Sequence, residues 1–407
     1  MSLLPFSPPR MDEKITEAVK EVLLSGWITT GPKTKLFEKK LTEYTGSKAT
    51  LCLNSATAGL EIMLRWFGVG DGDEVIVPAY TYSATANVCM HVGARPVLVD
   101  INPHDFNISV EAVRKAITPR TKVIMPVDFA GMPCDMDELN AIVNEENIRK
   151  LFKPGNEIQQ QLGRILILSD AAHSIGAQYK GKRTGSLCDV AVFSFHAVKN
   201  LTTAEGGAVA LNLPAPFDNE AVYKYLCIKT LHGQNKDALA KTQRGAWRYD
   251  ILEPGYKCNM MDIQAAIGLV ELERYDEDNL VRRKQIAERY IKALSVDPRF
   301  ELPVFETADK ISCYHLFPLR IRGCNEEQRD AIIDAIFARD ISVNVHFIPL
   351  PLLSFYKSEG YVMSDYPVAY DNYSREISLP LYYNLSDEDV DRVIAAVFAS
   401  VEEVLKA

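Results

Sequence analysis

Lys199 is the residue of this chain best placed to do chemistry. It follows the apolar run 190–193, which is short and rich in β-branched and aromatic residues like a buried strand, and it precedes a polar loop that ends in Gly206 and Gly207. Open α/β sheets bind ligands just beyond the carboxyl ends of their strands. Burial disfavours the charged form of a lysine there, and a neutral amine forms Schiff bases with carbonyl groups. The alternative interpretation is an exposed loop lysine.

A carboxylate follows a second predicted strand. Asp170 comes shortly after the apolar run 165–168, and two parallel strands would direct Asp170 and Lys199 to one crevice. A lysine for the aldehyde and a carboxylate for the ring nitrogen are the two protein groups that pyridoxal phosphate uses, because the carboxylate keeps the pyridine nitrogen protonated. The alternative role for Asp170 is to cap a helix over the following segment, AAHSIGA.

The segment NSATAG, residues 54–59, is a candidate phosphate site. It lies between the apolar run 49–53 and the sequence LEIMLRWF, which predicts a strand, a tight turn and a helix in succession. Free N–H groups and the dipole at a helix N-terminus bind anions, and hydroxyl side chains such as that of Ser194 add donors. Helix capping explains such a turn equally well, so the assignment depends on its combination with Asp170 and Lys199.

In this order, the motifs resemble those of the DegT/DnrJ/EryC1/StrS family of sugar aminotransferases, which are fold-type I pyridoxal-phosphate enzymes. The resemblance covers nearly the whole chain, through SGWITTGPKTKLFEKKLTEYTGSKATLCLNSATAGL, EVIVPAYTYSATANV, ILSDAAHSIGA, SFHAVKNLTTAEGGAVAL, GYKCNMMDIQAAIG, VNVHFIPL and ISLPLYYNLSDEDV. It implies an α/β fold with a mostly parallel central sheet. We expect a large cofactor-binding domain with an N-terminal arm in residues 1–260, and a linker helix with a smaller C-terminal α+β domain in residues 261–407.

The resemblance also implies roles for individual residues. Lys199 would bind the cofactor covalently and then shuttle the proton, and Asp170 would pair with the pyridine nitrogen. Tyr82 would stack on the cofactor ring, and Asn259 would reach the phosphate from a neighbouring subunit, which implies a homodimer with shared active sites. The expected cofactor-binding set is Lys199, Asp170, His173, Thr57, Ala58, Tyr82, Ser194 and Asn259. A satisfied core histidine is the alternative for His173.

Four further residues are expected to contact the substrate: Thr30, Gly31, His196 and His346. His196 belongs to an SFH form of the lysine motif that resembles aminotransferases acting at C4 of the sugar, such as those of the lipid A arabinose and pseudaminic acid pathways. The histidines show no metal-ligand spacing, so no metal site is predicted.

The reaction implied by the resemblance moves the amino group of L-glutamate to a nucleotide-linked 4-keto-6-deoxyhexose, with pyridoxamine phosphate as the intermediate form of the cofactor. UDP-2-acetamido-4-keto-2,6-dideoxyhexose is the first candidate substrate, and the product is a 4-amino sugar for surface polysaccharide or glycan synthesis. One alternative is a C3-aminotransferase acting on a dTDP-linked 3-keto sugar. The other is a non-catalytic protein that binds pyridoxal phosphate and acts as a regulator.

Composition narrows the class of protein. The formal net charge of −9 argues against a nucleic-acid partner, because binding to a phosphate backbone requires an excess of Lys and Arg. No apolar run approaches the ~18 residues that span a bilayer, and the N-terminus lacks a signal-peptide core, so we expect a cytoplasmic protein that does not bind membranes. Eight cysteines without a CxxC pair suit a reducing compartment.

Two segments and one single residue depart from a minimal pattern. Residues 144–163 are polar and predict a surface insertion. Asp128 stands in VDFAG where many members of the family carry a histidine. Residues 233–250 are either a solvated loop or a lid over the substrate, and the cationic and aromatic side chains of that segment are Lys236, Arg244, Trp247 and Arg248.

Overall fold

A seven-stranded sheet forms the centre of the computed structural model, which describes residues 3–235 and 248–406. The strand order is β1-β9-β8-β5-β4-β2-β3. β9 runs opposite to the other six strands, which all point the same way, so the predicted mostly parallel sheet is confirmed. The strands are β1 Ala49–Leu53, β2 Glu74–Pro78, β3 Arg95–Val99, β4 Thr121–Ile124, β5 Leu166–Asp170, β8 Val190–Ser194 and β9 Gly207–Leu211.

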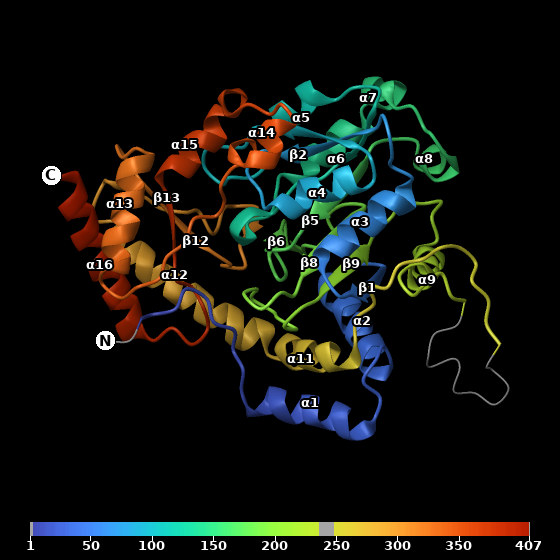
Figure 1. Ribbon diagram of the computed structural model, residues 1–407, viewed down its shortest axis with the longest axis horizontal. Helices are drawn as coiled ribbons and strands as arrows, with labels where there is room; N and C mark the ends of the chain where they lie inside the picture. Colours follow the sequence, from blue (N-terminus) through green and yellow to red (C-terminus); the bar gives the residue numbers. More distant parts are fainter. Residues whose placement is uncertain (1–2, 236–247, 407) are drawn as a thin grey trace.

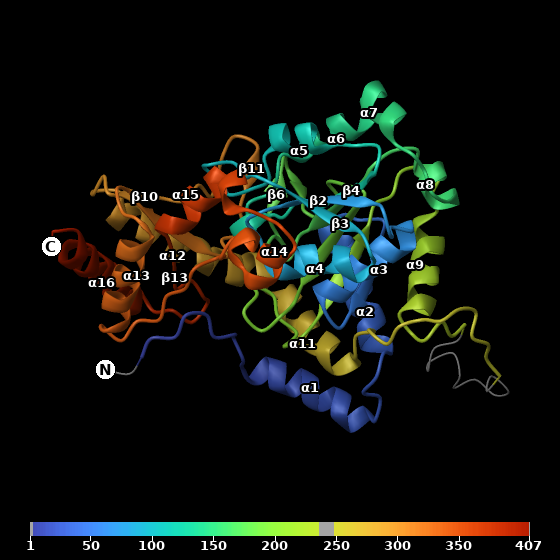
Figure 2. The ribbon, with the colours of Figure 1, turned by 45° about the horizontal axis from the view of Figure 1, so that its top comes forward.

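Helices cover both faces of this sheet, with α3 and α4 on one side and α5 and α6 on the other (Figures 1 and 2). Six of the seven strands are therefore buried at every position and read as continuous apolar runs. The helices of this part are α1 Glu13–Ser25, α2 Pro32–Thr45, α3 Ala56–Phe67, α4 Ser83–His91, α5 Val110–Ala116, α6 Met136–Asn144, α7 Glu146–Leu151, α8 Glu157–Leu162 and α9 Asn219–Lys229.

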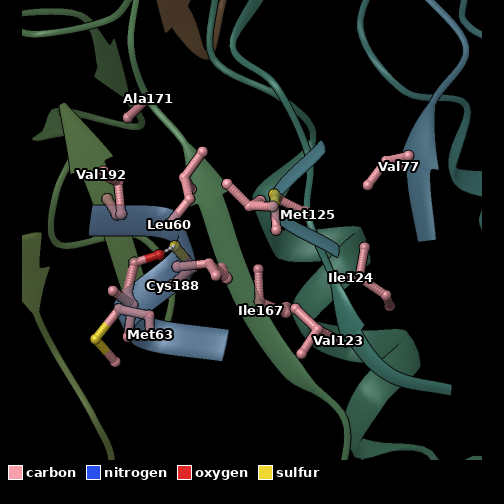
Figure 3. Close-up of a cluster of buried hydrophobic side chains, with 14 of the residues drawn as sticks. Leu60, Met63, Val77, Val123, Ile124, Met125, Ile167, Ala171, Cys188 and Val192 are labelled. Atoms are coloured by element: carbon pink, nitrogen blue, oxygen red, sulfur yellow. Dashed lines mark hydrogen bonds between the residues drawn. The ribbon is translucent and has the colours of Figure 1, made fainter. Parts of the chain in front are cut away.

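The core beneath the site is built where α3 crosses the central strands. Leu60 and Met63 of α3 lie against side chains of β8 and β5, including Val192 and Ile167 (Figure 3). All four side chains are almost completely buried. This packing fixes the N-terminus of α3 relative to the carboxyl ends of β5 and β8, which is the placement that the site requires.

The long helix predicted from residue 261 is present but interrupted. It consists of α11 Asp262–Glu273, a π-helical turn Tyr275–Leu280, and α12 Val281–Leu294. Tyr275 is fully buried in the π turn, where its hydroxyl donates to the carbonyl oxygen of Ile175 at 2.9 Å. The extra residue per turn lets Tyr275 reach the large core while α12 continues toward a second core.

That second core lies in the C-terminal part of the chain and contains residues between 286 and 401 together with Leu4 of the N-terminal arm. Its sheet has the order β10-β12-β13. Leu350 and residues of α14 and α15 pack instead on the large core, so the two parts share an extensive boundary. The elements are β10 Phe300–Glu301, β12 Phe317–Ile321, α13 Glu326–Phe337, α14 Ser354–Ser358, α15 Pro367–Arg375, β13 Glu376–Leu379 and α16 Asp387–Leu405. The domain boundary after residue 260 stays a prediction.

The insertion 144–163 lies at the surface and contains α7 and α8, but one of its polar side chains is anchored in the interior. Gln159 is fully buried and donates to the carbonyl oxygen of Phe67 at 2.9 Å. A small three-stranded sheet is made of β6 Gln178–Tyr179, β7 Lys182–Arg183 and β11 Lys310–Ile311. All eight cysteines are free thiols. Within the described parts of the chain, no helix combines the length and the apolar character that crossing a membrane requires.

Candidate active site

A cavity of about 340 Å³ opens at the carboxyl ends of β5 and β8. It has the position at which open α/β sheets bind ligands. Eight of the predicted site residues line it: Thr57, Tyr82, Asp170, His173, Ser194, His196, Lys199 and His346. Ala58, Thr30, Gly31 and Asn259 are not part of its lining.

Asp170 and Lys199 come to this cavity from adjacent parallel strands. Asp170 is the last residue of β5 and lies opposite Val192 of β8, and Lys199 follows β8 by five residues. No helix begins after Asp170, since the described residues 171–177 form turns, so the alternative role as a helix cap is wrong. The carboxylate is instead held by Thr85, whose hydroxyl donates to Oδ2 at 2.8 Å. The pairing of β5 with β8 therefore brings Asp170 and Lys199, which are distant in sequence, to one cavity.

The two groups have opposite pKa shifts with a common cause. Burial raises the pKa of Asp170, and the hydrogen bond from Thr85 and the charge of Lys199 oppose that rise. Burial lowers the pKa of Lys199 to about 8, against the opposing charge of Asp170. Lys199 is therefore partly deprotonated near neutral pH, which is the state in which an amine attacks a carbonyl group.

An anion cradle lies at the N-terminus of α3. Ser55 caps the helix by accepting a hydrogen bond from the backbone N–H of Ala58 at 3.1 Å, so that N–H is already used. The N–H groups of Ala56 and Thr57 precede any intrahelical acceptor and remain available, and the hydroxyl of Thr57 lines the cavity beside them. This donor set fits a phosphate group.

Gly207 allows this cradle to form. A Cβ atom at Gly207 would lie 2.4 Å from the backbone nitrogen of Ala56 and 2.5 Å from the carbonyl carbon of Ser55. The start of β9 therefore touches the turn before α3 directly. Ser194, one strand away, lines the same cavity, and its hydroxyl accepts from the backbone N–H of His196 at 3.4 Å.

Two neutral histidines lie next to each other in the lining of the cavity. The rings of His173 and His315 are 4.3 Å apart, and Nδ1 of His315 is 2.8 Å from Oδ1 of Asn200. Burial lowers the pKa of both histidines well below the ordinary value. Nδ1 of His173 is buried without a hydrogen-bond partner among the described residues, so His173 is not a satisfied core histidine. A buried polar atom without a partner calls for one, and His173 lines the cavity in which a cofactor ring would bind.

The rim of the cavity carries side chains that are open to solvent. His196 Nε2 lies 3.6 Å from Oε1 of Glu205. Tyr82 is 63% exposed, and its ring centroid lies 5.9 Å from that of Phe347. An exposed aromatic side chain and an exposed polar pair at the rim are suited to contact a substrate that enters the cavity from solvent.

Thr30, Gly31 and Asn259 form a separate cluster next to the start of α11. Asn259 Nδ2 donates to Thr30 Oγ1 at 2.5 Å, and the N–H of Gly31 donates to Oδ1 of Asp262 at 2.8 Å. The backbone of Asn259 forms a β-bridge with Leu53. The cluster therefore lies near the phosphate turn of its own chain while its side chains stay outside the cavity.

Several contributors were not expected from sequence. Thr85 fixes Asp170, His315 pairs with His173, and Phe6 and Phe347 line the cavity. Thr85 lies within the motif PAYTYSATANV, so the motif could have pointed to it. Phe6 arrives from the N-terminal arm, far from the other residues in sequence, and no local pattern marks it.

Two positions that were open at the sequence level have different outcomes. Asp128 has a structural environment, since its carboxylate accepts from Ser174 Oγ at 2.6 Å and from the N–H of Cys134 at 2.9 Å. The suggested lid is only partly within the described residues. Lys236, Arg244 and Trp247 lie outside them, so the lid interpretation stays a prediction.

Comparison with known proteins defines the class. The chain matches the DegT/DnrJ/EryC1/StrS aminotransferase family over residues 9–152 and 155–398, and it belongs to this family. It is 38% identical over 398 residues to the spore coat polysaccharide biosynthesis protein SpsC of Bacillus subtilis, covering 97% of this chain and 96% of SpsC.

Solved structures agree with this assignment. Spr1654 of Streptococcus pneumoniae, described as a sugar aminotransferase, is similar in its PLP form with a TM-score of 0.94 and 46% identity, over 99% of each chain. PseC of Helicobacter pylori, an aminotransferase of pseudaminic acid biosynthesis, has a TM-score of 0.85 and 30% identity over 99% of this chain and 100% of PseC. The protein is a pyridoxal-phosphate-dependent aminotransferase of the sugar aminotransferase family, which confirms the predicted family, fold-type I architecture and cofactor.

Proposed function

We propose that this enzyme transfers the amino group of L-glutamate to C4 of a nucleotide-linked 4-keto-6-deoxyhexose, with UDP-2-acetamido-4-keto-2,6-dideoxyhexose as the preferred acceptor. The 4-amino sugar would serve surface polysaccharide or glycan synthesis. The observation that carries the proposal is the convergence of Lys199 and Asp170 from adjacent parallel strands on one cavity. The relatives SpsC and PseC, with their roles in polysaccharide and pseudaminic acid synthesis, support the substrate class.

Different residues of the cavity would hold different parts of the cofactor. Asp170 would face the pyridine nitrogen, the α3 N-terminus with Thr57 and Ser194 would hold the phosphate, and Tyr82 would cover the ring from the rim. Pyridoxal phosphate supplies an electron sink that stabilises negative charge on the substrate carbon. A buried carboxylate is suited to that sink because it keeps the ring nitrogen protonated.

Lys199 has two tasks in this proposal. In its neutral form it would hold the cofactor, and its Nζ atom would take a proton from the substrate carbon and return it. Burial keeps the pKa of Lys199 near 8, so Nζ can both accept and return a proton near neutral pH. The neutral rings of His173 and His315 add no positive charge beside it.

The proposal includes a homodimer in the cytoplasm. Asn259 and Thr30 are bonded to each other outside the cavity of their own chain, an arrangement that suits a role at the active site of a second copy. The direct measurement is the mass of the protein in solution, where a dimer is expected.

Product analysis tests the substrate. The purified enzyme is incubated with ¹⁵N-glutamate and UDP-2-acetamido-4-keto-2,6-dideoxyhexose, and the product is examined by NMR. We expect ¹⁵N bonded to C4. A dTDP-linked 3-keto sugar serves as the comparison substrate, and preferential amination of that sugar at C3 would replace the C4 proposal. Cofactor binding without turnover of either sugar or of glutamate would favour the regulator.

A further inference from the structure

A chain of hydrogen bonds leads from the cavity wall to a buried carboxyl group. His346 Nδ1 is 2.9 Å from Ser378 Oγ, and Ser378 Oγ is 2.5 Å from Oε1 of Glu376. The other carboxyl oxygen of Glu376 accepts from the backbone N–H of His346 at 3.0 Å. Glu376 and Ser378 are fully buried and lie two residues apart on β13, so their side chains share one face of the strand.

His346 is held on several sides. The hydroxyl of Tyr80 donates to its carbonyl oxygen at 2.5 Å. The ring of Phe6 stacks on its ring with a centroid distance of 5.5 Å and an angle of 26°. Because Nδ1 is engaged with Ser378, the remaining ring nitrogen, Nε2, is left for the cavity that His346 lines together with Lys199.

The charges that face Glu376 do not pair with its carboxyl group directly. Arg320 of β12 is paired with Glu301 at 2.7 Å, and Arg329 of α13 is paired with Asp330 at 2.7 Å. Tyr80 is the other titratable group that interacts with Glu376. Burial raises the pKa of Glu376 to about 8 despite hydrogen bonds from Ser378 and His346 and the charges of the two arginines.

The chain has two consistent arrangements because the hydroxyl of Ser378 has a single proton. When Glu376 is ionised, Ser378 donates to it and accepts from Nδ1–H of His346, so Nε2 is a hydrogen-bond acceptor. When Glu376 carries a proton on Oε1, it donates to Ser378, which then donates to Nδ1, and Nε2–H becomes a donor. The ring of His346 is neutral in both, since burial lowers its pKa to about 3.

We propose that Glu376 and Ser378 are positioning residues that determine which ring nitrogen of His346 carries the proton, and thereby whether His346 presents an acceptor or a donor to the sugar beside Lys199. The sugar part of this inference rests on the proposed function. The acceptor form binds a donor on the sugar, such as a hydroxyl or an amide N–H. The amino group of glutamate is consumed by the transfer itself, and its two carboxylates accept hydrogen bonds, so the acceptor form of His346 offers those carboxylates no bond.

The tautomer can be observed directly in holoenzyme labelled with ¹⁵N-histidine, with the His346 signals assigned by their loss in His346→Gln. We expect the wild type to change from Nε2–H at low pH to Nδ1–H at high pH without passing through a charged ring. Glu376→Gln retains the acceptor for His346 N–H and offers an amide donor to Ser378, so it should stay in the Nε2–H form at every pH. Ser378→Ala should abolish the pH response. A His346 tautomer that is the same in wild type and both variants overturns the proposal.

Half-reaction kinetics test the consequence for the sugar. Above pH 8, where Glu376 of the wild type is ionised, we expect kcat/KM for UDP-2-acetamido-4-keto-2,6-dideoxyhexose to be lower in Glu376→Gln by about fivefold or more, while the rate with glutamate alone is not reduced. Glu301→Gln is the matched control, because it removes a carboxylate paired with the same Arg320 but does not contact His346. Equal losses in both half-reactions, or no loss with the sugar, overturn the positioning role. If the wild type itself fails to aminate this sugar, the proposed function fails, while the tautomer measurement still decides the proton arrangement.

Discussion

Thr85 Oγ1 donates a hydrogen bond of 2.8 Å to Oδ2 of Asp170. Both residues are buried, and Thr85 reaches Asp170 from α4 across the carboxyl end of the sheet. Burial alone would favour a neutral carboxylic acid at this position, and the bond from Thr85 acts against that tendency by stabilising the ionised form. Thr85, which lies outside β5, therefore helps to keep Asp170 ionised, as pairing with a pyridine nitrogen requires.

Replacing Thr85 by Val should weaken cofactor binding. The change keeps the shape of the side chain but removes the hydrogen bond, so the pKa of Asp170 rises further and less of the carboxylate is ionised. We expect the affinity for pyridoxal phosphate to fall by about tenfold, the scale of one hydrogen bond to a charged group. Thr85→Ser should restore most of it. Equal affinities of Thr85→Val and wild type, measured by equilibrium titration, would contradict this role.

The lowered pKa of Lys199 predicts a pH dependence for cofactor attachment. Only the neutral amine attacks the aldehyde, so the attachment rate of the apoenzyme should rise with pH through about 8 and level off above it. An ordinary lysine would still gain rate above pH 10. Stopped-flow absorbance between pH 6 and 10 gives the midpoint.

Asp170→Asn provides the control for this pH dependence. The charge of Asp170 raises the pKa of Lys199, so its removal should move the midpoint to lower pH. A wild-type rate that rises without levelling off up to pH 10 would show that Lys199 keeps the ordinary pKa of a lysine and is not desolvated.

Gly207→Ala should damage the anion cradle. The added Cβ would meet the backbone nitrogen of Ala56 at 2.4 Å, so β9 and the start of α3 must separate. We expect a loss of about 1–3 kcal/mol in the free energy of unfolding and a weakened affinity for the phosphate of the cofactor. Gly70→Ala is the control, because its nearest neighbour would be 3.8 Å from the new Cβ. Wild-type affinity in Gly207→Ala would refute the close-contact explanation.

A buried ion pair lies at the amino ends of β5 and β8, away from the site. Its loss should reduce stability and leave the site intact. Arg164 and Asp189 form two hydrogen bonds of 2.7 Å, and Asp189 also accepts from the N–H of Ile167 at 3.0 Å. Asp189→Asn leaves a buried arginine without its counter-charge, and we expect a cost of about 3 kcal/mol in urea unfolding. Cofactor affinity should be unchanged, and a parallel loss of affinity would show that the pair is coupled to the site.

The parts of the site that could be predicted from sequence are those that follow from a single strand and the turn after it. Asp170, Lys199 and Thr57 each follow an apolar run at its carboxyl end, and parallel strands bring such ends together. The family motifs supplied Tyr82 and His346, which patterns of hydrophobicity do not mark.

Residues that depend on tertiary contacts could not be predicted in this way. Phe6 reaches the cavity because the N-terminal arm pairs with the C-terminal part through Leu4 and Ile341, more than 300 residues apart in sequence. The π turn at 275–280 depends on the buried position of Tyr275. The amphipathic pattern of this segment is the same as that of a regular α-helix, so it does not reveal the π turn. The sequence also does not show that the N–H of Ala58 bonds to the hydroxyl of Ser55, and the role of Ala58 at the phosphate stays a prediction.

The most direct test of the central claim, that Lys199 binds pyridoxal phosphate and glutamate donates the amino group, is the visible absorption spectrum of the holoenzyme before and after addition of glutamate. Lys199→Ala is measured alongside, with circular dichroism to show that it is folded. The account predicts a visible cofactor band in the wild type that is absent from Lys199→Ala and that glutamate converts to the spectrum of pyridoxamine phosphate. The same visible band in Lys199→Ala, or a wild-type band that glutamate leaves unchanged, would contradict the account.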